Sequence, residues 1–94
     1  MSQYDPFRPR AEPAATIYDA FQEEATKRKG RKFEEWSAAE IEAVLRCAIL
    51  QAKKHGLRPP TMEEVNRAER YARGSVDYGA KWAFVIVETM RKAA

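Results

Sequence analysis

The sequence is poor in the residues from which catalytic and metal sites are built. Its 94 residues include one cysteine, Cys47, and one histidine, His55. A single cysteine excludes a disulfide within the chain and is typical of a reducing compartment. The two residues lie eight positions apart on one predicted helix, about 12 Å along its axis, which is too far for a thiolate–imidazole pair. The spacing of acids, cysteine and histidine does not match a metal site, and a glycine-rich phosphate loop is missing. We therefore expect a protein that is not an enzyme and that needs no metal or cofactor.

Long apolar runs are also missing. No run approaches the roughly 18 apolar residues of a membrane span. The first ten residues, MSQYDPFRPR, carry charges and prolines where a signal peptide needs an apolar segment. We therefore expect a cytoplasmic protein without a membrane segment. The net charge of +3 and the pI of about 9.2 permit an anionic partner without requiring one.

Residues 1–13 are predicted to form an extended N-terminal arm. Pro6, Pro9 and Pro13 disfavour a helix in this stretch. The arm also carries two aromatic and two basic side chains, which are Tyr4, Phe7, Arg8 and Arg10. Because disordered tails usually lack aromatic residues, we expect the arm to lie over a groove, either on its own domain or on another chain.

Residues 14–94 are predicted to form a single compact all-α domain of four helices. Apolar residues recur there with helical spacing, and glycines and prolines separate the segments. The expected helices span about residues 16–29, 38–55, 62–73 and 76–91. A lone run such as WAFVIV in the last segment has no second strand to pair with, so a helix is favoured there as well.

The expected helix starts rest on capping residues. Two capping boxes have the required spacing, Ser37 with Glu40 and Thr61 with Glu64. In these motifs the first side chain accepts a backbone N–H of the first turn, and the acid three positions later reaches back. Thr16 and Ser75 are the expected caps of the first and last helices.

The predicted core is organised around the last helix, and one apolar face of each of the other three helices is expected to pack against it. The core stripe of the second helix is Ile41, Val44, Leu45, Ala48, Ile49 and Ala52. The apolar arc of the last helix is wider than one neighbouring helix would cover, so this helix is central in the fold or part of it is an interface. Phe84 falls among the polar residues of that helix. Either the arm covers Phe84, or Phe84 is an exposed anchor for a partner.

Two basic clusters are candidate phosphate contacts. The first is the loop KRKGRK, with Lys27, Arg28, Lys29, Arg31 and Lys32. The second is the outer face of the third helix, with Arg67, Arg70 and Arg73. The favoured explanation of the two clusters is structural, a solvated loop for the first and a salt-bridged helix for the second. The functional alternative is contact with the phosphates of an anionic partner.

The segment EEVNRAERYARGSVDYGAKWA, residues 63–83, resembles stretches of small phage or prophage accessory proteins. The resemblance covers about a quarter of the chain and includes no diagnostic motif. It implies a non-enzymatic protein that acts by binding host proteins, including defence and regulatory machinery.

The sequence therefore favours a non-catalytic binding protein that occupies a partner's surface, such as a phage-type inhibitor of a host complex. The predicted partner-binding residues are Tyr4, Phe7, Arg8, Arg10 and Phe84. One alternative is a small basic regulator that binds nucleic acid or a nucleotide through the two basic clusters. A second alternative is a self-assembling structural protein in which the apolar arc of the last helix lies between copies.

Overall fold

The computed structural model describes residues 5–28 and 31–93, and it confirms the predicted all-α fold with four main helices. In chain order the elements are α1 (Ala14–Lys27), the short 3-10 helix η1 (Phe33–Glu35), α2 (Ala38–His55), α3 (Met62–Ala72) and α4 (Tyr78–Ala93). No strand occurs in these residues. None of the described helices is both long and apolar enough to cross a lipid bilayer.

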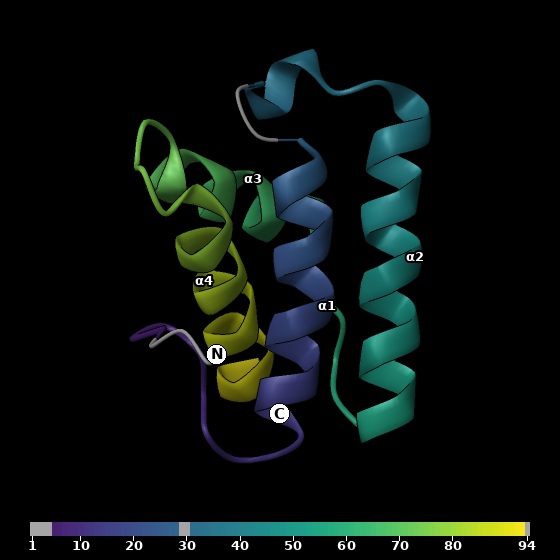
Figure 1. Cartoon of the computed structure of the whole chain (residues 1–94). Coiled ribbons are helices and arrows are strands. Elements are labelled where there is room, and N and C mark those ends of the chain that lie inside the picture. The colour runs from purple at the N-terminus through teal and green to yellow at the C-terminus, as the bar shows by residue number, and fades with distance from the viewer. Residues whose placement is uncertain (1–4, 29–30, 94) are drawn as a thin grey trace.

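The helices form a flat molecule of 33 × 31 × 20 Å. α1 lies between α4 and α2, and α3 packs against α4 near the start of that helix (Figure 1). η1 contacts α3. α2 therefore lies at one edge of the fold, with α1 as its main helical neighbour.

The core is built on α4, with Trp82 at its centre. Trp82 is fully buried, and its ring centre lies 6.0 Å from Phe21 and 6.1 Å from Trp36. Ile86 and Met90 are also fully buried. The wide apolar arc of this helix thus packs inside its own domain, as expected for a helix that is central in the fold.

The two capping boxes are confirmed, and α2 and α3 begin at the predicted residues. The Glu40 N–H donates to Ser37 Oγ at 3.2 Å, and the Ser37 N–H donates to the Glu40 carboxylate at 2.9 Å. The matching distances are 3.1 Å for the Glu64 N–H to Thr61 Oγ1 and 2.8 Å for the Thr61 N–H to the Glu64 carboxylate. Local side-chain chemistry therefore sets both helix starts.

The starts of α1 and α4 differ from the prediction by two residues each. Thr16 is not a cap, because it lies in the first turn of α1. Its N–H and its hydroxyl both donate to the Glu12 carboxylate. Ser75 is not a cap either, because α4 starts three residues later. Its hydroxyl accepts a hydrogen bond from the Lys81 ammonium at 3.1 Å. In both cases the residue expected to cap the helix is hydrogen-bonded to a longer side chain instead, which is Glu12 for Thr16 and Lys81 for Ser75. At the other ends, α1 stops two residues earlier than predicted, α3 one residue earlier, and α4 continues two residues further.

The predicted core stripe of α2 is only partly buried. Val44, Ala48 and Ala52 are buried, as expected. Ile49, however, is 55% exposed, so its assignment to the core is wrong. Because α2 lies at the edge and packs mainly on α1, a single narrow line of its residues is covered. The neighbouring Leu50 is 62% exposed for the same reason.

Candidate functional site

The described part of the arm, residues 5–13, is held on its own domain by polar contacts. The Tyr18 hydroxyl donates to the Asp5 carboxylate at 2.6 Å. Arg8 donates to both carboxylate oxygens of Asp19, at 2.9 and 2.8 Å, and these hydrogen bonds lower the pKa of Asp19. Burial raises the pKa of the Tyr18 phenol, so the phenol stays protonated and can donate. The arm is thus fixed along α1.

Phe7 covers Phe84. Their ring centres lie 5.8 Å apart with the planes at 65°, and both side chains are partly buried. The arm therefore shields this aromatic residue of α4, which is the first of the two predicted alternatives. Tyr4 lies outside the described residues, and Arg10 is exposed. A partner-binding role for these residues stays a prediction, while Phe7, Arg8 and Phe84 have clear contacts within the chain.

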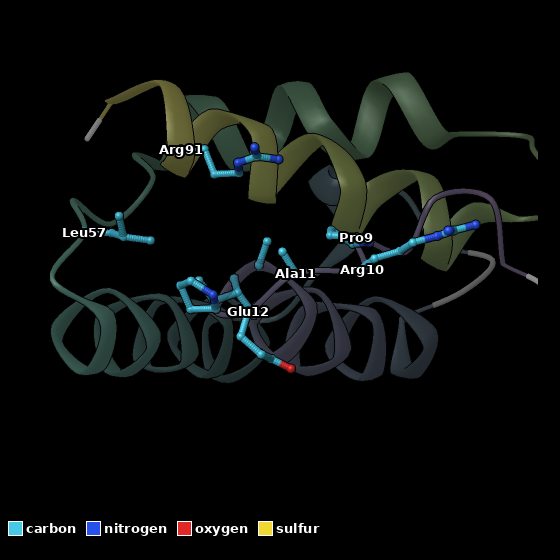
Figure 2. Close-up of a pocket in the computed structure, with 9 residues that line it drawn as sticks. Pro9, Arg10, Ala11, Glu12, Leu57 and Arg91 are labelled. Carbon is cyan, nitrogen blue, oxygen red and sulfur yellow. The ribbon is translucent and has the colours of Figure 1, made fainter.

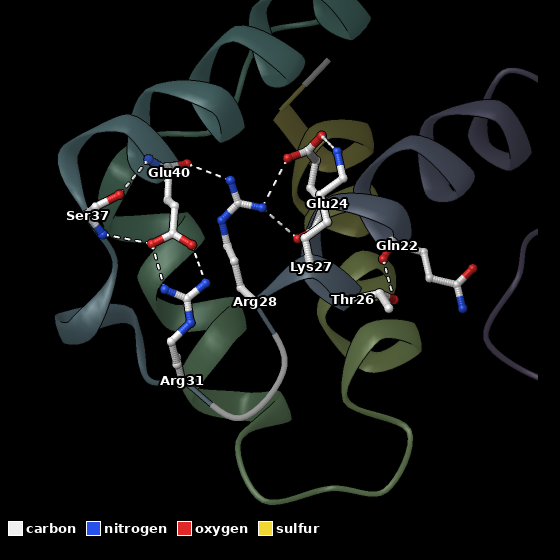
Figure 3. A network of polar contacts seen from close by, with 8 residues as sticks. All are labelled: Gln22, Glu24, Thr26, Lys27, Arg28, Arg31, Ser37 and Glu40. Atoms are coloured by element: carbon white, nitrogen blue, oxygen red, sulfur yellow. Dashed lines mark hydrogen bonds and ion pairs between the residues drawn. The ribbon is translucent and has the colours of Figure 1, made fainter.

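Arg28 of the predicted phosphate loop is a buried link between two helices (Figure 3). Its side chain is 3% exposed. It donates to the Glu24 carbonyl at 2.6 Å, to the Glu24 carboxylate at 3.0 Å and to the Glu40 carbonyl at 2.8 Å. Its guanidinium lies 5.3 Å from the centre of the Trp36 ring. Arg28 thus ties the end of α1 to the start of α2.

Two other described cations of this loop, Lys27 and Arg31, also pair with carboxylates. Arg31 donates to the Glu40 carboxylate at 2.8 Å, and these hydrogen bonds lower the pKa of Glu40 to about 2. Lys27 pairs with a carboxylate of its own helix at 3.4 Å. Lys32 is exposed, and Lys29 lies outside the described residues. Most of the charge that a phosphate would need is therefore already neutralised within the domain.

Arg73, which directly follows α3, differs from the two arginines before it. Arg73 pairs with the buried carboxylate of Glu69 and, at 2.9 Å, with that of Glu34 on η1. The hydrogen bonds that Arg73 donates to the Glu69 carboxylate raise the pKa of Arg73 further. Arg67 and Arg70 are exposed, and within residues 5–28 and 31–93 neither forms an ion pair. Of the three predicted arginines, Arg73 therefore forms ion pairs within the domain, while Arg67 and Arg70 are exposed and form none in the described residues.

Two exposed apolar side chains lie within ten positions of Arg67 and Arg70 in the chain. Tyr71 is 59% exposed, and it follows Arg67 by one helical turn, so the two side chains are neighbours on α3. Val76, in the link to α4, is 94% exposed. The Lys81 ammonium lies 5.9 Å from the centre of the Tyr71 ring. We call the set Arg67, Arg70, Tyr71 and Val76 the α3–α4 surface.

Sequence reasoning missed Tyr71 and Val76 as members of a candidate site. Tyr71 could have been found from its spacing of four residues from Arg67, which puts both on one helix face. Val76 could not, because its position was assigned to the first turn of the last helix and its exposure depends on where that helix starts.

Cys47 is the one nucleophilic thiol of the chain, and its surroundings keep it protonated. The side chain is half-buried, and burial, together with the negative charges of Glu24 and Glu23, raises its pKa to about 11. A thiol in this state is a weak nucleophile at neutral pH. In the described part of the chain, acids, cysteine and histidine form no group of three or more that could hold a metal ion.

The pairing of the arginines narrows the candidate sites. Seven of the ten arginines form ion pairs with carboxylates: Arg8, Arg28, Arg31, Arg46, Arg58, Arg73 and Arg91. Within the described residues, this leaves Arg10, Arg67 and Arg70 without one, and the last two belong to the α3–α4 surface.

The chain matches no protein-family model, no curated protein and no solved structure.

Proposed function

We propose that this protein is a non-catalytic binding protein that occupies the surface of a partner protein through the α3–α4 surface. The observation that carries the proposal is the exposure of Tyr71 beside Arg67 and Arg70, neither of which pairs with a carboxylate in the described part of the chain. Tyrosine and arginine are the side chains that most often dominate binding energy at protein interfaces. Because Arg67 and Arg70 need not break an ion pair first, they are free to meet acidic groups of the partner.

The composition of the surface favours a protein over a nucleic acid. Val76 is almost fully exposed and aliphatic, and an aliphatic side chain gains free energy when a complementary apolar surface covers it. Glu63, on the same helix, is exposed and would repel phosphates. The net charge of +3 is modest for a protein that follows a phosphate backbone. The partner surface that fits best is therefore acidic with an apolar centre.

The resemblance of residues 63–83 to small phage or prophage accessory proteins supports a host protein as the partner, because the α3–α4 surface lies within that segment. An inhibitor that acts by covering a host complex agrees with both the exposed α3–α4 surface and this resemblance. Such a role places the protein in the cytoplasm, in keeping with its single cysteine.

The proposal is tested by affinity capture from a lysate of the organism that the protein acts in. The test variant is Arg67→Glu with Arg70→Glu. The matched control is Lys53→Glu with Lys54→Glu, which makes the same change of charge at exposed positions of α2. We expect the wild type and the control to retain one specific protein, and the α3–α4 variant to lose it, with all three equally folded by circular dichroism.

Equal retention by both double variants would overturn the proposal, because binding would then not depend on the α3–α4 surface. Co-purified nucleic acid that is lost at high salt and lost in the Arg67/Arg70 variant would also overturn it. That result would favour the alternative of a nucleic-acid-binding regulator, in which Tyr71 stacks on a base and the arginines contact phosphates.

A further inference from the structure

A cavity of about 630 Å³ lies at the opposite end of α4 from the α3–α4 surface. Residues 9–13 of the arm, the start of α1, Leu57 and the end of α4 form its walls (Figure 2). Its apolar lining includes Pro9, Ala11, Pro13, Ile17 and Leu57. This volume and this lining are typical of sites for small molecules.

Three charged residues line the cavity, which are Arg10, Glu12 and Arg91. Arg91 lines the cavity from the end of α4 (Figure 2). It is 58% exposed, and its ion pair is with Glu88 on its own helix at 3.1 Å, so it can turn to a ligand at low cost. The Arg10 side chain extends away from Leu57 and Arg91 (Figure 2). The Glu12 carboxylate points away from the cavity and is occupied by the N–H and hydroxyl of Thr16.

We propose that this cavity binds a small amphipathic carboxylic acid, with its aliphatic chain on the apolar lining and its carboxylate at Arg91. The planar guanidinium matches a carboxylate with two parallel hydrogen bonds. A singly charged head suits the site better than a phosphate, because Arg91 already shares its charge with Glu88. The site is separate from the α3–α4 surface, since Tyr78 and Arg91 lie about 20 Å apart along α4.

The test is a titration of ¹⁵N-labelled full-length protein with decanoate below its micelle-forming concentration, followed by NMR chemical shifts. Decanol is the matched ligand, because it keeps the aliphatic chain and lacks the charge. We expect saturable shifts centred on Ile17, Leu57 and Ala11, and a dissociation constant for decanoate about tenfold lower than for decanol.

Variants show whether the cavity is responsible. Arg91→Gln is expected to remove the tenfold preference for decanoate and to leave decanol binding unchanged. Lys92→Gln, which loses the same charge at the next, exposed position, is expected to change neither. Leu57→Trp is expected to fill the cavity and to weaken both ligands at least tenfold while the remaining spectrum stays that of the folded protein.

Three results would overturn the proposal. The first is the absence of saturable shifts for decanoate. The second is shifts that centre outside the cavity, for example around Arg67 and Arg70. The third is equal affinity for decanoate and decanol in the wild type, because the site would then not recognise the carboxylate.

Discussion

Replacement of Arg28 by alanine tests whether the first basic cluster is structural. If Arg28 ties α1 to α2, its loss should lower the free energy of unfolding. If the loop exists to contact phosphates, its loss should leave stability nearly unchanged and affect ligand binding alone. The two explanations therefore predict opposite results for the same substitution.

The expected magnitude follows from the contacts of Arg28. Its side chain is 3% exposed and donates to two carbonyls and to the Glu24 carboxylate. Removal of one partner of a buried, hydrogen-bonded ion pair costs about 3–5 kcal/mol. We expect the lower end, about 3 kcal/mol, because Glu24 is 16% exposed and can regain some hydration. For a domain of this size, that loss lowers Tm by about 12–24 °C.

The assay is urea unfolding followed by circular dichroism, with a thermal melt as the second measurement. Arg46→Ala is the matched control, because Arg46 also pairs with a glutamate on its helix but both side chains are 71% exposed. An exposed pair of this kind is worth about 0–1 kcal/mol. A cost for Arg28→Ala that is no larger than for Arg46→Ala would refute the structural account of Arg28.

Three further predictions concern the arm, a close helix contact and acid stability. Phe7→Ala removes an edge-on aromatic pair with Phe84 and should cost about 1–1.5 kcal/mol in a thermal melt, with faster tryptic cleavage of the arm; unchanged cleavage would show that this pair does not hold the arm. Gly79→Leu should cost about 2 kcal/mol in urea unfolding, because a Cβ there already meets a hydroxyl of α1 at 3.0 Å; no cost would contradict the close contact of α1 and α4. The hydrogen bonds from Arg31 hold the pKa of Glu40 at about 2, below its ordinary 4.5, so this group stabilises the fold above pH 4.5 and loses that effect as the pH falls from 4.5 to 2. Glu40→Gln should therefore show a smaller fall in the urea midpoint between pH 5 and pH 2 than the wild type, and an identical fall would contradict the assignment.

The elements that could be predicted from the sequence are those set by local chemistry. Ser37 and Thr61 fix the starts of α2 and α3, because a capping box involves residues within one turn. The periodic apolar residues were sufficient for the helix number and the all-α class. The starts of α1 and α4 were missed because Thr16 and Ser75 form hydrogen bonds with Glu12 and Lys81, which lie outside the capping motifs expected from the sequence.

The burial of single residues could not be predicted, since it depends on how many neighbours each helix has. Ile49 fits the core stripe of α2 by spacing, yet it is exposed because α2 lies at the edge. Arg28 sits in the densest run of charge, yet it is buried because two carbonyls and the Trp36 ring come together around it. Periodicity gives the face of a helix, while the packing partner decides how much of that face is covered.

The candidate site was predicted in part. Arg67 and Arg70 were named from their spacing, and they are exposed. Arg73 shares that spacing, but η1 brings Glu34 to it from 39 positions away in the chain, and no local pattern shows such a contact. The cavity at the end of α4 combines residues of the arm, α1, the α2–α3 link and α4, so sequence reasoning had no signal for it.

The central claim is that the protein binds its partner through the α3–α4 surface and not through the aromatic residue that the arm covers. The most direct test compares partner capture by Tyr71→Ala and by Phe84→Leu, at a temperature at which both variants are fully folded. The account predicts that Tyr71→Ala weakens capture at least about tenfold, as for a residue that dominates an interface, and that Phe84→Leu retains it. Retention by Tyr71→Ala together with loss by Phe84→Leu would contradict the account.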